Sequence, residues 1–178
     1  DLEDVLIHAA GSGVGSVGIQ VAKLRGARVI ATAGSDEKLE KARALGADEV
    51  VNYTREDWPK EVRRLTERRG VDVVFEHTGA ATWPGSILCL KRDGRLVTCG
   101  ATSGGDARTD LRHVFYRHLN ILGSFMGSKS ELLEAMLERL VQAYLALDAE
   151  VARRGRRDVA EAAHRVADPS AHVGQPPA

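Results

Sequence analysis

Two hydrophobic patterns alternate along the 178 residues of the chain. Short continuous apolar runs, typical of buried strands, are each followed by a segment in which apolar residues recur at helical spacing. The predicted strands are the run that starts at Val5, Arg28–Thr32, Asp48–Tyr53, Val71–Glu76, Gly94–Gly100 and Leu119–Ser124. The predicted helices are the segment after the first strand, Asp36–Leu45, Trp58–Arg69, Ala81–Leu90 and Ser128–Leu147. This alternation favours an α/β fold whose parallel sheet is covered by helices on both faces.

Polar residues at the predicted helix starts support these boundaries. Ser35 stands where a side chain caps the helix that begins at Asp36. Thr54–Asp57 and Ser128–Glu131 resemble capping boxes, in which a hydroxyl residue is followed three positions later by an acid. Glycines follow the first three helices and are expected to end them: Gly26, Gly46 and Gly70.

The first strand runs into a glycine-rich segment and then into helical spacing at Val17, Val21 and Leu24. The literal Gly-x-Gly-x-x-Gly sequence is Gly13–Gly18, but the helical spacing places Gly18 inside the helix. We therefore assign the turn to Ala10–Gly15. A strand that delivers the chain through glycines to a helix N-terminus leaves backbone N–H groups free to hold a pyrophosphate. An ordinary tight turn is the alternative, because glycine triplets are common.

This turn selects the doubly wound, dinucleotide-binding form of the fold, a parallel six-stranded Rossmann sheet with strand order 3-2-1-4-5-6. Ligands of such sheets lie at the carboxyl ends of the strands, beside the switch between strands one and four. The candidate functional segments are therefore Ala10–Gly15, Thr32–Lys38, Tyr53, Glu76–Gly79, Gly100–Ser103 and Ser124–Gly127.

Composition narrows the class of protein. The 25 Lys and Arg residues equal the 25 Asp and Glu residues, so charge gives no reason to expect nucleic acid or an anionic membrane as a partner. No apolar run approaches the roughly 20 residues of a membrane span, and no signal-peptide pattern precedes the first strand, so we expect a cytoplasmic protein. Cys89 and Cys99 lack the spacing of a metal site and are expected to be buried structural thiols.

The end of the second strand bears on the choice between NAD and NADP. Sites for NAD usually place an acidic residue there to bind the ribose hydroxyls, whereas this chain has Ala33–Ser35. Lys38, one turn into the next helix, supplies a cation that favours a 2′-phosphate. Asp36 and Glu37 lie close by: NADP is expected if their side chains point to solvent, and NAD if one of them turns into the pocket.

Several segments together resemble the nucleotide-binding domain of the medium-chain dehydrogenase/reductase superfamily, which includes the zinc-type alcohol dehydrogenases and the quinone oxidoreductases. The resemblance covers about residues 2–140 and rests on His8–Gly15, Ile19–Lys23, Gly26–Thr32, Leu45–Asp48, Gly94–Val97 and Gly100–Gly104. Gly34–Lys38, followed by Asn52 and Tyr53, is similar to the quinone reductase branch. The resemblance therefore implies NADP as the cofactor, with NAD as the second choice.

The resemblance also implies roles for individual residues. The pyrophosphate would lie on Gly11, Ser12, Gly13 and Val14, and the adenosine 2′-phosphate would lie among Ser35, Lys38 and Tyr53. The nicotinamide would be bordered by Thr78, Gly79, Gly100, Ala101, Phe125 and Met126. For Tyr53 a place in the core at the strand end is the alternative, and for His77 a structural role is the favoured interpretation. No catalytic residue is assigned.

We expect residues 1–147 to form the dinucleotide-binding domain and residues 148–178 to form a basic, Gly- and Pro-containing tail with one short helix. Family members bind substrate, and any catalytic zinc, in a separate domain that we expect to be missing here, and no Cys/His/Glu set predicts a zinc site. The expected function is that of the cofactor domain of an NADP(H)-dependent oxidoreductase, which transfers hydride to or from a carbonyl, alcohol or quinone. We further expect a homodimer that pairs through the sixth strand; a noncatalytic dinucleotide-sensing or dimerisation module is the alternative.

Overall fold

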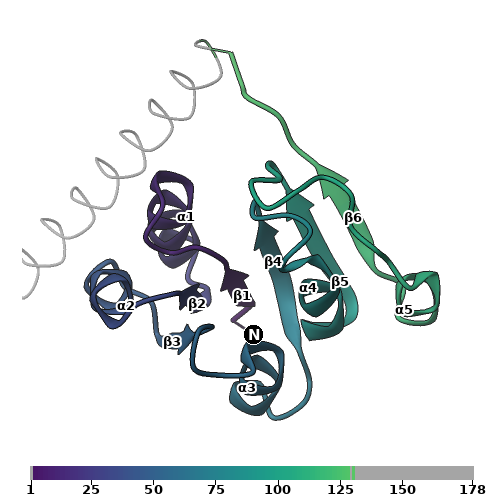
Figure 1. Ribbon diagram of the computed structural model, residues 1–178, viewed down its shortest axis with the longest axis horizontal. Helices are drawn as coiled ribbons and strands as arrows, with labels where there is room; N and C mark the ends of the chain where they lie inside the picture. The colour runs from purple at the N-terminus through teal and green to yellow at the C-terminus, as the bar shows by residue number, and fades with distance from the viewer. Residues whose placement is uncertain (1, 129, 131–178) are drawn as a thin grey trace, which may run out of the picture. The chain divides into compact units, whose positions relative to one another are not determined.

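The computed structural model describes residues 2–128 and 130 of the chain (Figure 1). In chain order its elements are β1 (Asp4–Ile7), α1 (Gly13–Leu24), β2 (Arg28–Ala33), α2 (Asp36–Ala44), β3 (Glu49–Asn52), α3 (Trp58–Leu65), β4 (Val71–Glu76), α4 (Trp83–Cys89), β5 (Leu90–Thr98), α5 (Leu111–Tyr116) and β6 (Asn120–Gly123). They belong to the compact unit that ends at Met126.

All six strands pair in parallel, in the order β3-β2-β1-β4-β5-β6, which confirms the predicted fold and strand order. The strands follow this order from left to right in Figure 1. Strand β1 lies between β2 and β4, with Leu6 opposite Ile30 on one side and Val74 on the other. From β1 the chain adds β2 and β3 on one side of the sheet, and then crosses to add β4, β5 and β6 on the other. A doubly wound sheet binds its ligand at this switch, between β1 and β4.

Two hydrophobic clusters cover the two faces of the sheet. Leu6 of β1 belongs to a cluster that includes Val62 of α3 and Ile87 of α4, whereas the next residue, Ile7, belongs to a cluster with Ile19 of α1 and Leu39 of α2. Successive strand residues point to opposite faces, so both residues are buried only because helices cover both sides. The continuous apolar strands of the sequence follow from this arrangement.

The boundaries of α3 differ from the prediction at one end. The helix begins at Trp58 as predicted, but its N-cap is Asp57, whose Oδ1 accepts a bond from the Lys60 N–H, so the proposed Thr54–Asp57 capping box is wrong. The helix ends at Leu65 instead of Arg69, because Glu67 and Arg68 have φ angles of 52° and 66°. Left-handed residues cannot continue a right-handed helix.

Three further differences follow from local packing. Leu90 was assigned to the helix before β5, but it pairs with Val71 and opens the strand four residues before Gly94. Helix α5 was not predicted, and none of its six residues is buried, so it carries no periodic apolar signal. Cys89 is buried as expected, but Cys99 is exposed, because it follows the last residue of β5.

The predicted Ser128–Leu147 helix with its capping box, and the 148–178 tail, lie outside the described residues, apart from Ser128 and Ser130. The predicted boundary at residue 147 thus stays a prediction. Within the described part of the chain, no helix is long and apolar enough to cross a membrane.

Candidate dinucleotide-binding site

The turn after β1 brings free backbone N–H groups to the surface. Helix α1 starts at Gly13, and the Ser12 hydroxyl caps it by accepting a bond of 2.9 Å from the Gly15 N–H. Within the described residues, the N–H groups of Gly11, Gly13 and Val14 make no hydrogen bond, and all three residues are exposed. Unpaired N–H groups at a helix N-terminus, where the helix dipole is positive, form an anion-binding site.

The glycines of this turn differ in the space around them. A Cβ at Gly15 would stand 2.5 Å from the Ala9 carbonyl oxygen, so only glycine lets α1 approach the end of β1 this closely. A Cβ at Gly13 would meet nothing within 4 Å, which leaves open space beside the free N–H groups. Gly18 lies inside α1, as predicted from the helical spacing. The turn is therefore Ala10–Gly15, with α1 beginning within it.

Lys38 and Tyr53 lie over the glycines at the ends of β1 and β2. The stem of Lys38 passes across Gly11, where a Cβ would stand 2.9 Å from its Cγ and Cδ atoms. Tyr53 is 46% exposed, and a Cβ at Gly34 would stand 2.7 Å from its hydroxyl oxygen. The core position considered for Tyr53 is therefore wrong. Ser35 precedes α2 as its N-cap but makes no side-chain capping bond, so its hydroxyl is not engaged in the helix.

The two acidic residues next to Lys38 in the sequence, Asp36 and Glu37, are each held by other side chains. Asp36 accepts bonds of 2.9 Å from Asn52 Nδ2 and 2.8 Å from Arg55, and these contacts hold the pKa of its carboxyl below the usual value. Glu37 pairs with Lys41 at 2.6 Å. Lys38 makes no hydrogen bond or ion pair among the residues that the structure describes. The acids are thus engaged, and the lysine is free.

A buried polar network supports the loop after β4. Glu76 is fully buried at the end of this strand, and its carboxylate accepts bonds from the N–H groups of Thr78 and Gly79 and from the hydroxyls of Thr82 and Ser86, at 2.7–3.1 Å. Burial works to raise the pKa of Glu76, but the charge of His8 and the donors around the carboxylate outweigh it and lower the pKa. Glu76 was noted only as part of a strand end, and its bracing role was missed. A carboxylate at the last position of this strand, directly after Val73, Val74 and Phe75, was the available signal.

His8 connects the network to the neighbouring strands. Its Nδ1 lies 3.0 Å from the Thr32 hydroxyl and its Nε2 lies 2.9 Å from the Ser86 hydroxyl, so one side chain links β1, β2 and α4. His77 is also buried and donates through Nε2 to the His8 carbonyl at 2.9 Å. This contact fits the structural role favoured for His77 from the sequence.

The pH dependence of stability should report on His8. Burial lowers the pKa of His8 to about 4. The charge of Glu76 works to raise this pKa, and the charge of His77 works to lower it further. Between the ordinary histidine pKa of about 6.5 and pH 4, the unfolded chain binds the proton and the folded chain does not, so the free energy of unfolding should fall as pH decreases through this window. Chemical denaturation at a series of pH values should show a flatter slope for His8→Gln than for the unsubstituted chain. An unchanged slope in His8→Gln would contradict the assignment.

The loops proposed for the nicotinamide end pack against each other. The Ser103 N–H donates to the Thr78 carbonyl at 2.7 Å, and the Ala80 N–H donates to the Gly104 carbonyl at 2.9 Å. Gly79, with φ +93°, packs against Ala101 and Gly104, and Gly100 packs against His77. Phe125 and Met126 are 86% and 83% exposed, so the structure does not bring them against these loops.

A family model described as zinc-binding dehydrogenase matches residues 13–142 of the chain. Quinone oxidoreductase 1 of Escherichia coli (strain K12) is 35% identical over 141 residues, which cover 76% of this chain and 43% of that protein. A crystal structure described as an NAD-dependent alcohol dehydrogenase is 56% identical, with a TM-score of 0.71, and the match covers 79% of this chain and 40% of that one. The E. coli quinone oxidoreductase complexed with NADPH is 34% identical, with a TM-score of 0.68 over 76% of this chain and 43% of that one.

The chain thus spans less than half the length of these relatives. Within residues 2–128 and 130, no group of three His, Cys, Asp or Glu side chains is placed to hold a metal ion, so the described residues do not fit a zinc site. The family match, the strand order and the glycine turn after β1 all indicate the same family. The chain belongs to the zinc-binding dehydrogenase family of the medium-chain dehydrogenase/reductase superfamily, a family of NAD(P)-dependent oxidoreductases.

Proposed function

We propose that the chain is the NADP(H)-binding domain of an oxidoreductase that transfers hydride to or from a carbonyl, alcohol or quinone. The observation that carries the proposal is the set of three free N–H groups at Gly11, Gly13 and Val14, beside the unpaired Lys38. When bound, the nicotinamide supplies the hydride chemistry. The described residues bind and orient the dinucleotide, and we propose that the substrate is bound by residues outside them.

The pyrophosphate would lie on the turn. The N–H groups of Gly11, Gly13 and Val14 donate to its oxygens, and the open space at Gly13 admits it. Ser12 holds the turn in shape, because its hydroxyl is already committed to the Gly15 N–H. The dipole of α1 adds a favourable term for the negative charge.

The adenosine end favours NADP over NAD. An acidic side chain that binds the ribose hydroxyls would repel a 2′-phosphate. Here Asp36 is held by Asn52 and Arg55 and Glu37 by Lys41, and the two acidic side chains are 61% and 77% exposed, which supports NADP. Lys38, Ser35 and Tyr53 remain to meet the phosphate. Arg55, which the sequence reasoning missed, adds a second cation beside Asp36.

The relatives divide on this point: one is described as an NAD-dependent alcohol dehydrogenase, and another was crystallised with NADPH. The choice between the two cofactors depends on the charge beside the ribose, so the side chains of this chain carry the proposal. The engaged acids and free lysine support NADP.

A titration of the purified chain with NADPH and NADH tests the proposal. Lys38→Ala should weaken NADPH binding about tenfold, because a charge-assisted hydrogen bond to the 2′-phosphate is lost, and should change NADH binding less than about twofold. Fluorescence of the reduced nicotinamide measures both affinities.

Lys41→Ala is the matched control, since Lys41 lies on the same helix but pairs with Glu37. Tighter binding of NADH than of NADPH by the unsubstituted chain would contradict the 2′-phosphate assignment. Binding of neither dinucleotide would reject the site as a whole.

At the nicotinamide end, we propose that Thr78, Gly79, Gly100 and Ala101 border the ring. Support comes from the contacts between their two loops and from Glu76, which fixes the N–H groups of Thr78 and Gly79. Phe125 and Met126 stay in the proposal as exposed apolar residues beyond β6. Their place beside the ring rests on the family resemblance alone.

We also propose that the protein forms a homodimer in which β6 pairs with its copy. All four β6 residues are exposed, and the strand pairs only with β5, which leaves one edge of backbone groups free among the described residues. Light scattering of the chain reports its mass. Leu122→Lys should shift the population toward monomer, since a charge on an edge strand disfavours pairing.

A further inference from the structure

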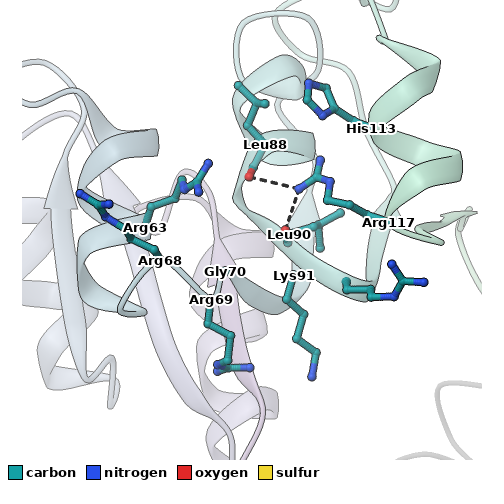
Figure 2. Close-up of a pocket in the computed structure, with 10 residues that line it drawn as sticks. Arg63, Arg68, Arg69, Gly70, Leu88, Leu90, Lys91, His113 and Arg117 are labelled. Atoms are coloured by element: carbon teal, nitrogen blue, oxygen red, sulfur yellow. Dashed lines mark hydrogen bonds between the residues drawn. The ribbon is translucent and has the colours of Figure 1, made fainter.

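A pocket lined by positive side chains lies at the amino ends of β4 and β5. The proposed dinucleotide site lies at the other end of the strands, their carboxyl ends. Its volume is about 270 Å³. It is bounded by the end of α3, the starts of β4 and β5, the end of α4, and α5 (Figure 2). The lining residues are Arg63, Arg68, Arg69, Gly70, Leu88, Leu90, Lys91, Arg92, His113 and Arg117, with no aspartate or glutamate among them.

Some of these cations already have partners. Arg69 and Lys91 both pair with Asp72. Arg117 donates to the carbonyl oxygens of Ile87 and Leu90 at 2.8 Å, which are neutral acceptors. Contacts with neighbouring groups of the fold therefore account for the positions of Arg69, Lys91 and Arg117.

The positions of the Arg63 and Arg68 side chains are not accounted for by such contacts. Neither guanidinium makes a hydrogen bond or ion pair with any residue that the structure describes. The left-handed turn at Arg68 lets its N–H donate to the Arg63 carbonyl at 2.6 Å, which holds the two arginines together at the end of α3. The fold therefore gathers two unpaired cations on one side of the pocket.

Arg117 lies across the pocket from Arg63 and Arg68, as Figure 2 shows. Burial and the charge of Arg63 lower the pKa of Arg117, and its Nε is buried without a hydrogen-bond partner among the described residues. Like charges that line one pocket without a carboxylate among them repel, and a bound anion would offset this repulsion.

We propose that this pocket is a second ligand site, which binds a compact phosphate-bearing anion such as a diphosphate. Guanidinium groups match phosphate oxygens with two parallel hydrogen bonds, so Arg63, Arg68 and Arg117 together suit a multiply charged phosphate better than a single carboxylate. The volume of about 270 Å³ lies just below the range of about 300–1,000 Å³ that holds drug-sized ligands, so the ligand is small. The proposal does not depend on dinucleotide binding.

Inorganic pyrophosphate is the probe, added to the isotopically labelled chain at about 0.15 M salt to screen non-specific attraction. We expect amide NMR shifts at Gly70, Leu90 and Lys91. The double variant Arg63→Gln/Arg68→Gln should weaken this binding about tenfold or more, because two charged contacts are lost. The matched control is Arg25→Gln/Arg108→Gln, which removes two exposed arginines that also lack side-chain partners in the described chain. It should change the affinity less than about twofold.

The dinucleotide site is itself an anion site, so the position of the shifts decides the outcome. Shifts confined to Gly11–Val14, equal losses in both double variants, or no binding of pyrophosphate would each overturn the proposal. Citrate, which carries its charge on carboxylates, should bind more weakly than pyrophosphate. Equal or tighter binding of citrate would overturn the assignment to phosphate.

Discussion

Glu76→Ala should lower the free energy of unfolding by about 3–5 kcal/mol, the range expected when a buried charged network loses its central partner. The carboxylate is fully buried and accepts bonds from Thr78, Gly79, Thr82 and Ser86, so its removal leaves buried N–H and O–H groups without an acceptor. Each unsatisfied buried donor costs about 1–3 kcal/mol. Urea unfolding followed by circular dichroism measures the loss.

Two variants distinguish the network from burial alone. Glu76→Gln keeps one oxygen for the Thr78 and Gly79 N–H groups but presents an amide donor to Ser86, so it should lie between the alanine variant and the unsubstituted chain. Glu40→Ala, at an exposed carboxylate 3.7 Å from Arg43, should change stability by less than about 0.5 kcal/mol. A loss below about 1 kcal/mol in Glu76→Ala would show that the network does not support the loop.

Gly15→Ala should destabilise the protein by about 2–3 kcal/mol, as expected for an atom forced into closely packed structure. The new Cβ would stand 2.5 Å from the Ala9 carbonyl oxygen and 3.0 Å from the Ala10 Cα, and both are backbone atoms that side-chain rotation cannot move. Helix α1 must then shift away from β1, which moves the free N–H groups of the turn. Thermal unfolding and NADPH titration should both show a loss.

Gly13→Ala is the control for this variant. Its Cβ meets nothing within 4 Å, so stability should stay within about 0.5 kcal/mol of the unsubstituted chain. The same methyl group enters the space proposed for the pyrophosphate, so NADPH affinity should fall without loss of stability. If Gly15→Ala proves as stable as Gly13→Ala, the close approach of α1 to β1 is not a requirement of the fold.

The fold could be predicted from the sequence because its determinants are local. The apolar run at Val71–Glu76 matched β4 residue for residue, and the register of the glycine turn followed from the spacing of Val17, Val21 and Leu24. Helix α5 was missed because it buries no residue, and the end of α3 was missed because positive φ angles at Glu67 and Arg68 have no glycine to signal them.

The candidate site was predictable only in part. Lys38 and Tyr53 could be identified because they follow the ends of predicted strands. The direction of the Asp36 side chain, in contrast, depends on Asn52 and Arg55, which lie 16 and 19 residues away. The Glu76 network was hidden for the same reason, since His8 reaches Ser86 across 78 positions. Contacts between side chains distant in the chain have no periodic pattern in the sequence.

The stem of Lys38 lies across Gly11, where an added Cβ would stand 2.9 Å from two of its carbon atoms. A side chain at position 11 would therefore displace the lysine as well as crowd the pyrophosphate. In the proposed site, pyrophosphate affinity and coenzyme preference are therefore coupled, and a substitution in the turn that alters one should also alter the other. Reversing the coenzyme preference would have to begin on helix α2, with the glycine left in place.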